Sequence, residues 1–192
     1  EQSATSGMEG RGYYNQHSEL QNVGIAHQRD RLISAVARIP LTHDELRIVD
    51  FGCGPGRNSV AELDGILAAL RARAPQINLV ATHNDLIGND WSDLVAQLRG
   101  PESYLEHVPG TRVELSIDSF FEQVASEGSV DLGVSFGAVH WLSRYIGVSA
   151  PGSLFFCDVP EPARAEIAAQ AASDWHAFLA NRSREVEPGG ML

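Results

Sequence analysis

The sequence predicts an α/β fold, in which a mostly parallel sheet of the Rossmann-like kind is flanked by helices. Short apolar segments typical of strands alternate with longer segments whose apolar residues recur at helical spacing. The first predicted strand ends in a glycine-rich turn that leads into a helix, and polar or aromatic residues follow the later strands. Because the carboxyl ends of parallel strands meet at one edge of a sheet, we expect these loops to form one ligand-binding edge.

In the first half of the chain, a helix is predicted at 18–38, where Ser18 can cap a run of apolar residues at helical spacing. A continuous apolar run predicts a short buried strand at 47–51. Val and Leu residues at helical spacing then predict a helix at 59–73, and a second apolar run predicts a strand at 77–82.

In the second half, a short helix is predicted at 91–99, where a Gly-Pro pair ends it. Strands are predicted at 112–117, from alternating polar and apolar residues, and at 130–136. A weaker strand is predicted at 153–157, and an Ala-rich helix at 161–185, where a proline is tolerated in the first turn.

Length and charge limit the class of protein. A chain of 192 residues predicts one domain at 13–192 after a flexible arm at 1–12. The formal net charge of −11 argues against nucleic acid and anionic membranes as partners. Cys53 and Cys157 give no disulfide framework, so we expect buried free thiols in a cytoplasmic protein.

The two ends of the chain carry different signals. The amino-terminal residues are polar and do not form a signal peptide, and no apolar run is long enough to span a bilayer. Residues 188–192 are typical of a turn that leads into a new strand. We therefore expect the domain to be truncated at its carboxyl end, before its last strands.

The glycine-rich turn is Asp50-Phe51-Gly52-Cys53-Gly54-Pro55-Gly56, whose glycines let backbone approach a ligand closely. A dinucleotide fingerprint would need a small residue where this chain has Arg57, so that interpretation fails. The pattern D-x-G-x-G-x-G is instead that of class I methyltransferases that bind S-adenosylmethionine. Asp50 would steady the turn or meet the cofactor's ammonium group. The alternative is a glycine turn without a ligand.

Three further positions at this edge suggest roles. Asp85 can accept hydrogen bonds from ribose hydroxyls, and Ser119 with Phe120 can lie beside adenine. His140 and Trp141 can donate to an acceptor carboxylate. The seven His residues show no metal-ligand spacing, so no metal site is predicted.

A serine hydrolase is the remote alternative. Gly133-Val134-Ser135-Phe136-Gly137 matches the G-x-S-x-G nucleophile elbow, with Asp158 or Asp174 and His176 available as partners. The apolar and aromatic residues that follow do not favour the helix that an elbow requires.

Taken together, the motifs resemble those of the plant-type SABATH methyltransferases, which methylate salicylate, benzoate, jasmonate and theobromine-like substrates. The family's S-Y-x-x-N-S-x-x-Q, D-L-G-C-S-S-G-P-N and S-F-Y are similar to 13–21, 50–58 and 119–121. Its N-D-L-P-G-N-D-F, the most specific match, resembles 84–91. Its S-L-H-W-L-S and F-L-x-x-R-A-x-E-L-x-P-G-G-x-M resemble 138–143 and 178–191.

The resemblance implies an S-adenosylmethionine site and an acceptor site held by Gln21 and Trp141, with His140 nearby. It also implies a helical cap beyond the point where this chain ends. Two departures concern the acceptor: Glu9 stands where the family often has Lys, and Gly137 stands where it often has an aromatic residue. The implied cofactor-binding residues, with those of the turn, are Tyr14, Gln21, Asp50, Gly52, Cys53, Gly54, Asn58, Asp85, Leu86, Ser119 and Phe120.

The predicted function is methylation of the carboxylate of a small, aromatic acid. A carboxylate is already ionised at neutral pH, so catalysis would consist of positioning and exclusion of water. The alternatives are an N- or O-methyltransferase of the same fold, for which His140 is the candidate base, and a non-catalytic relative that binds the cofactor or a partner. Apolar surface left by missing strands would favour a homodimer.

Overall fold

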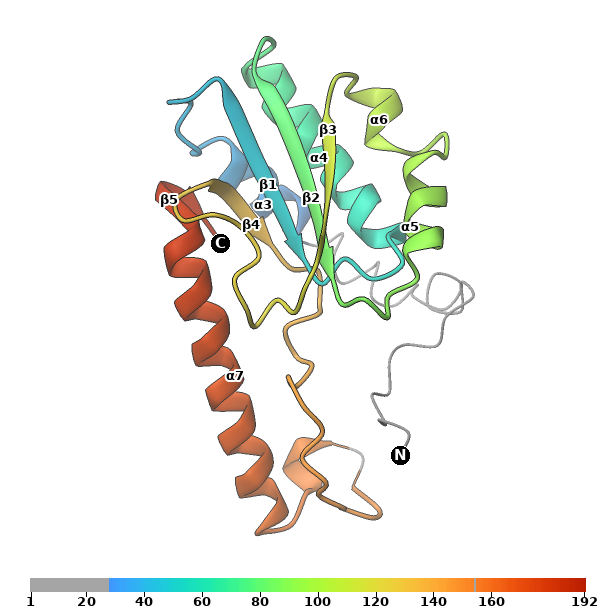
Figure 1. The fold of residues 1–192 in the computed structure, drawn as a ribbon, viewed down its shortest axis with the longest axis vertical. Helices are drawn as coiled ribbons and strands as arrows, with labels where there is room; N and C mark the ends of the chain where they lie inside the picture. Colours follow the sequence, from blue (N-terminus) through green and yellow to red (C-terminus); the bar gives the residue numbers. More distant parts are fainter. Residues whose placement is uncertain (1–27, 154) are drawn as a thin grey trace.

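The computed structural model describes residues 28–153 and 155–192 as an α/β fold built on one five-stranded sheet (Figure 1). The strand order is β3-β2-β1-β4-β5, and all neighbouring strands run parallel. The predicted α/β class with a mostly parallel sheet is therefore confirmed. The strands are β1 (Glu45–Phe51), β2 (Asn78–Asp85), β3 (Arg112–Ile117), β4 (Val130–Val134) and β5 (Val186–Met191).

Helices cover both faces of the sheet. One face packs against α3, α4, α5 and α6, with α4 at the centre of the contacts, and α7 runs along the other face and continues past the carboxyl ends of the strands (Figure 1). The helices are α3 (Arg29–Val36), α4 (Arg57–Arg73), α5 (Trp91–Leu98), α6 (Tyr104–His107) and α7 (Ala163–Glu185), with a short 3₁₀ helix η1 (Phe156–Asp158).

The central strand β1 explains why the first apolar run has no polar alternation. Leu46 and Ile48 belong to the core beneath α4, whereas Val49 and Phe51 belong to the core beneath α7. Because side chains alternate between the faces of a strand, a strand covered on both faces must be apolar throughout. The same alternation turns Asp50 toward the α4 side, where a carboxylate has no place in an ordinary core.

The second face is anchored by a buried ion pair near the end of α7. The Arg182 guanidinium donates to both carboxylate oxygens of Glu185, at 2.7 and 2.9 Å, and to the carbonyl oxygens of Phe120 and Glu122, at 2.6 and 2.9 Å. Glu185 also accepts the backbone N–H of Val124 at 2.6 Å. These bonds fix the loop that follows β3 against α7.

Several sequence expectations need correction. The weak strand at 153–157 is wrong: the described residues of this segment are irregular at 153 and 155 and belong to η1 from Phe156, and Cys157 is exposed, whereas Cys53 is buried as expected. The four-residue helix α6 was not predicted, because it is too short to show periodicity. Strand β5 begins at Val186, directly after α7, with an irregular register against β4.

Part of the predicted first helix, 18–38, lies outside the described residues, and the rest corresponds to α3. Within the described part of the chain, no helix combines the length and the apolar character that crossing a membrane requires.

Candidate functional site

The glycine turn is bound to the end of the neighbouring strand β2. The backbone N–H groups of Gly52 and Cys53 both donate to the carbonyl oxygen of Asn84, each at 2.9 Å. The N–H of Gly54 donates to Asp85 Oδ2 at 2.7 Å, and the side-chain amide of Asn89 donates to the Gly54 carbonyl at 2.8 Å. Residues from the N-D-L-x-G-N-D segment therefore hold the turn in position.

Gly52 is required by both conformation and space. Its φ of +83° lies in the left-handed region that favours glycine. A Cβ at this position would lie 2.1 Å from Ala138 Cβ and 3.3 Å from Phe120 Cε1. The loop that follows β4 and the aromatic residue that follows β3 therefore both approach the turn, as the sequence predicted.

Two polar side chains beside the turn are buried without partners among the described residues. Asp50 is fully buried, and neither of its carboxylate oxygens has a hydrogen bond of normal geometry. Asn58, in the first turn of α4, is also buried with both side-chain polar atoms unpartnered. Buried polar groups are normally paired in folded proteins, so such atoms indicate a place where a ligand supplies the missing groups.

The electrostatics at Asp50 favour a cationic ligand. Burial raises the pKa of Asp50 to about 7, with a smaller raising effect from the nearby Asp85 and a lowering effect from Ser59. Burial also raises the pKa of Asp85, against the lowering effect of its two backbone hydrogen bonds. A positive charge beside Asp50 would stabilise the anionic form that burial disfavours. The ammonium group of S-adenosylmethionine has that chemistry.

Asp85 also has acceptor capacity to spare. Its Oδ1 accepts the backbone N–H of Leu86 at 2.8 Å, and its Oδ2 accepts the N–H of Gly54. Each carboxylate oxygen has a second lone pair, so hydroxyl donors can still bind. The Leu86 side chain is exposed next to it.

Phe120 and Ser119 lie at the end of β3. The ring of Phe120 lies 4.5 Å from that of Phe121 and meets Phe178 of α7 edge-on at 6.1 Å. The Ser119 hydroxyl accepts the backbone N–H of Phe121 at 3.3 Å. Phe120 therefore packs against the core beneath α7 and also lies close to Gly52 of the glycine turn.

The candidate acceptor-side residues lie in the loop after β4. His140 and Trp141 are exposed, with their ring centroids 5.3 Å apart, and the backbone N–H of Trp141 donates to Ala138. Since Ala138 lies against Gly52, the pair follows directly after the residue that contacts the turn. The predicted positions Tyr14 and Gln21 lie outside the described residues.

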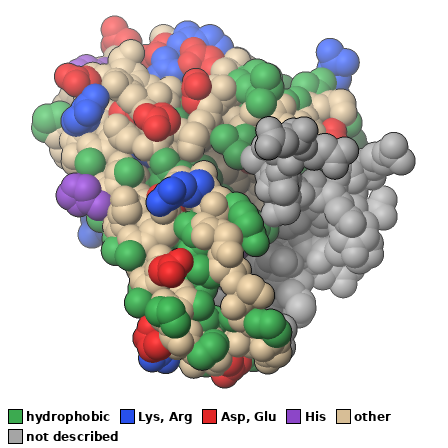
Figure 2. Space-filling view, turned by 60° about the horizontal axis from the view of Figure 1, so that its bottom comes forward, with side chains coloured by type: hydrophobic (Ala, Val, Ile, Leu, Met, Phe, Trp, Pro, Cys, Tyr) green, Lys and Arg blue, Asp and Glu red, His purple; other side chains and the backbone are tan. Residues whose placement is uncertain are grey.

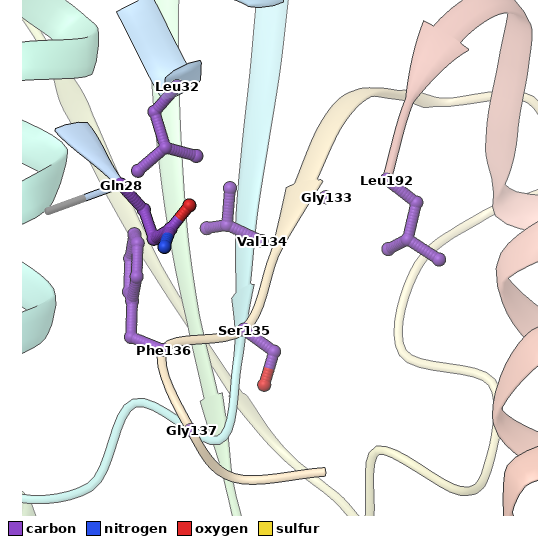
Figure 3. A pocket seen from close by; sticks show the side chains of 8 residues that line it. All are labelled: Gln28, Leu32, Gly133, Val134, Ser135, Phe136, Gly137 and Leu192. Carbon is purple, nitrogen blue, oxygen red and sulfur yellow. The ribbon is translucent and has the colours of Figure 1, made fainter. Parts of the chain in front are cut away.

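A pocket of about 350 Å³ opens beside the carboxyl end of β4 (Figure 3). The side chains of Leu32 and Val134 point into it, and the Ser135 hydroxyl points away, toward the Phe51 carbonyl that accepts its hydrogen bond at 2.8 Å. A Cβ added to Gly137 would meet no atom within 4 Å, so this side of the pocket is open. The lining residues are Gln28, Leu32, Gly133, Val134, Ser135, Phe136, Gly137 and Leu192.

Ser135 does not form a nucleophile elbow. Strand β4 ends at Val134, and turns and bends, not a helix, follow at 135–143. Asp174, a predicted hydrolase partner, instead binds Ser143 through its hydroxyl at 2.6 Å and its backbone N–H at 2.8 Å. Among the described residues, no group of three His, Cys, Asp or Glu side chains is arranged to hold a metal ion.

The carboxyl end of the sheet exposes apolar side chains on the loop after β4 and on α7. Figure 2 brings this end forward and shows hydrophobic side chains among the polar ones. The large exposed residues here are Trp141, Tyr145, Phe155, Phe156, Trp175 and Leu179.

Sequence reasoning missed a buried hydrogen-bonded group beneath the turn. The Ser59 hydroxyl lies 2.9 Å from His83 Nδ1, and the Tyr104 hydroxyl lies 2.8 Å from His83 Nε2. The available signal was a histidine that follows an apolar run within a predicted buried strand, where an apolar residue is the ordinary choice.

Comparison with known proteins adds a family match. Residues 2–192 match the family model described as SAM-dependent carboxyl methyltransferase. O-methyltransferase acrG of Aspergillus aculeatus is 31% identical over 192 residues, which cover 96% of this chain and 50% of that protein. Gibberellic acid methyltransferase 2 of Arabidopsis thaliana is 25% identical over 93% of this chain and 50% of that protein.

The solved structure titled "Loganic acid methyltransferase with SAH" superimposes with a TM-score of 0.77 over 96% of this chain and 56% of that one. At 20% identity this likeness supports the fold. The chain spans about half the length of the curated relatives it matches.

Proposed function

The chain belongs to the SAM-dependent carboxyl methyltransferase family, and from this premise we propose that the whole protein methylates the carboxylate of a small, aromatic acid. The observation that carries the proposal is the buried, unpartnered carboxylate of Asp50 beneath the glycine turn. A structural carboxylate would have donors of its own, whereas neither oxygen of this one has a hydrogen bond of normal geometry among the described residues.

Bound S-adenosylmethionine would supply a methyl group on a sulfonium, from which an acceptor oxygen takes the methyl carbon as the carbon–sulfur bond breaks. On the protein side, Asp50 would hold the ammonium group and Asp85 the ribose hydroxyls. The backbone of Gly52, Cys53 and Gly54 would line the cofactor, with Leu86, Ser119 and Phe120 along the adenine. The side-chain amide of Asn58, which has no partner among the described residues, would donate hydrogen bonds to the cofactor and accept them from it. Tyr14 and Gln21 complete this set from the family resemblance.

The acceptor side of the proposal uses the loop after β4. Gln21, His140 and Trp141 would donate to the acceptor carboxylate, which fixes one oxygen toward the methyl carbon. No general base is required, because a carboxylic acid is ionised at neutral pH. Relatives named for gibberellic acid and jasmonate support an acid as the acceptor. The apolar pocket beside β4 is suited to the body of such an acid.

The decisive experiment is a tritiated-methyl transfer screen with the full-length protein over benzoates, indole acids, fatty acids and xanthines. We expect label in acids, with the aromatic ones preferred. Label in fatty acids alone would contradict the aromatic acceptor. Label in xanthines or amines alone would contradict the carboxyl acceptor and favour the N-methyltransferase alternative, for which a relative named caffeine synthase 1 is the supporting observation.

A matched pair of substitutions tests the acceptor residues. Trp141→Ala should lower kcat/KM for the preferred acid by about tenfold or more, because a positioning hydrogen bond is lost. Trp175→Ala, at a tryptophan that is 51% exposed like Trp141, should leave kcat/KM within about twofold. Equal effects of the two substitutions would contradict a specific role for Trp141.

A further inference from the structure

The described structure contains a buried polar chain that leads from the candidate cofactor site into the core. It consists of Asp50 on β1, Ser59 on α4, His83 on β2 and Tyr104 at the start of α6. All four are at most 1% exposed. Asp50 and His83 are register partners on neighbouring strands, so both side chains lie on the face that α4 covers.

Short contacts connect Ser59, His83 and Tyr104 one after the other. Ser59 Oγ lies 2.9 Å from His83 Nδ1, and His83 Nε2 lies 2.8 Å from the Tyr104 hydroxyl. Ser59 is also the neighbour that lowers the pKa of Asp50, although no hydrogen bond of normal geometry joins the two side chains. Burial lowers the pKa of His83 to about 4, so its ring is neutral and carries one proton.

One proton can occupy either ring nitrogen, and the two tautomers differ in what they leave unpaired. With the proton on Nε2, His83 donates to Tyr104, and Ser59 donates to Nδ1. The buried phenol proton of Tyr104 then has no acceptor, because His83 is its one hydrogen-bond partner among the described residues. Ser59 then has no proton left for Asp50, and leaving buried groups unpaired disfavours this tautomer.

With the proton on Nδ1, the phenol proton and the ring proton both have acceptors. Tyr104 donates to Nε2, Nδ1–H donates to Ser59 Oγ, and the Ser59 hydroxyl proton is free for Asp50. Burial raises the pKa of Tyr104, so this phenol remains a donor. A linear chain of this kind gains from cooperative polarisation.

We propose that Tyr104 and His83 are positioning residues, which act through Ser59 to hold Asp50 as the anion that binds the cofactor. Tyr104 fixes the His83 tautomer, and the tautomer directs the Ser59 hydroxyl proton toward Asp50. This inference rests on the proposed function for the role of Asp50, but the tautomer itself does not depend on it. Other titratable groups that share charge interactions with Asp50 are Asp85, Cys53 and Tyr104.

The first test is the tautomer. Nitrogen-15 NMR of the imidazole-labelled protein, without cofactor, should show His83 neutral at pH 7 with its proton on Nδ1. Tyr104→Phe removes only the hydroxyl that donates to Nε2, so the preference for Nδ1–H should be lost. Tyr145→Phe, which removes a hydroxyl from an exposed ring, should change nothing. A proton on Nε2 in the unsubstituted protein would overturn the proposal.

The second test is the pH dependence of cofactor affinity, measured by calorimetry with S-adenosylmethionine. Tyr104→Phe and Ser59→Ala should each weaken binding about three- to tenfold at pH 7, because Asp50 loses a donor and is protonated more often. The defect should shrink at pH 8.5, where Asp50 is ionised in any case. Ser59→Thr, which keeps the hydroxyl, should restore most of the affinity.

The outcomes separate the two proposals. A defect of equal size at pH 7 and pH 8.5 would indicate a merely structural effect and overturn the positioning role. If the unsubstituted protein bound no cofactor, the proposed function would fail, while the NMR result would still decide the tautomer.

Discussion

Two buried charged regions of this protein differ in how their hydrogen bonds are satisfied. On the α7 side, Arg182 and Glu185 are almost inaccessible, and each is bonded to the other and to backbone groups. On the α4 side, Asp50 is equally inaccessible and has no partner of normal geometry among the described residues. The satisfied pair has a structural role, whereas the lack of a partner at both oxygens of Asp50 supports a binding role for that carboxylate.

The largest expected effect comes from breaking the Arg182–Glu185 ion pair on the α7 side. Arg182→Met should lower the free energy of unfolding by about 3–5 kcal/mol, because Glu185 is left buried without its cation. The measurement is urea unfolding followed by circular dichroism. The double substitution Arg182→Met with Glu185→Leu should recover part of the loss. A loss below about 1 kcal/mol in the single variant would contradict the structural role.

Substitution of Asp50 on the α4 side should preserve stability but weaken cofactor binding. Asp50→Asn should leave the free energy of unfolding at pH 7 unchanged or slightly higher, because a disfavoured buried charge is removed. Cofactor affinity should fall by roughly tenfold or more, since a charge-assisted contact is worth about 1.5–3 kcal/mol. Asp131→Asn changes a buried carboxylate that accepts the Arg47 backbone N–H at 2.7 Å and serves as the control. Equal losses of affinity would refute the assignment of Asp50.

Asp50 and His83 should contribute with opposite signs to the pH dependence of the free energy of unfolding. The pKa of Asp50 is raised, so its contribution to stability is fully present below pH 3.8 and is lost as the pH rises through about 7. The pKa of His83 is lowered, so its contribution is present above pH 6.5 and is lost as the pH falls toward about 4. In the unsubstituted protein the two slopes oppose each other.

Removal of Asp50 should therefore change the pH dependence of stability by the contribution of Asp50. Between pH 7.5 and pH 5, the change in unfolding free energy of Asp50→Asn should be about 2 kcal/mol less favourable than that of the unsubstituted protein, because only the latter gains stability as Asp50 is protonated, while Asp131 and His83 titrate in both. Urea unfolding at the two pH values measures this. Equal pH profiles of the two proteins would contradict the raised pKa of Asp50.

The smallest effect concerns the close approach at the glycine turn. Gly52→Ala and Gly110→Ala impose the same backbone strain, since φ is +83° at one and +82° at the other. Only Gly52 adds a clash, with Ala138, whereas Gly110 faces open space. Gly52→Ala should therefore cost about 1–2 kcal/mol more in thermal or urea unfolding. Equal costs would mean that the loop after β4 moves away freely.

The sequence was sufficient for much of the fold, because the elements beneath the site show strong periodicity. The strands at 47–51 and 112–117 and the helix at 59–73 are all observed, with ends that differ by at most two residues at the first strand and the helix. The segment at 153–157 failed because a short run of apolar residues resembles a strand whether or not a partner strand lies beside it.

Site residues could be predicted from the sequence where they belong to a short local motif. Asp50, Gly52 and Asp85 belong to such motifs, and the fold brings them together. The Ser59–His83–Tyr104 chain was not predictable, because its members come from three elements and their relation appears only when α4 and α6 pack on β2. The homodimer and the roles of Tyr14 and Gln21 stay predictions.

The strand order has a consequence for how the chain must be assembled as it leaves the ribosome. Strands β1, β2 and β3 can pair as soon as Ile117 has emerged, so the glycine turn and the polar chain beneath it belong to the portion that can form first. The other edge of β1 then stays open until β4 arrives, and β5 follows only after all of α7. An unpaired central strand with Val49 and Phe51 uncovered is a template for aggregation, so the nascent chain should depend on chaperones during that interval.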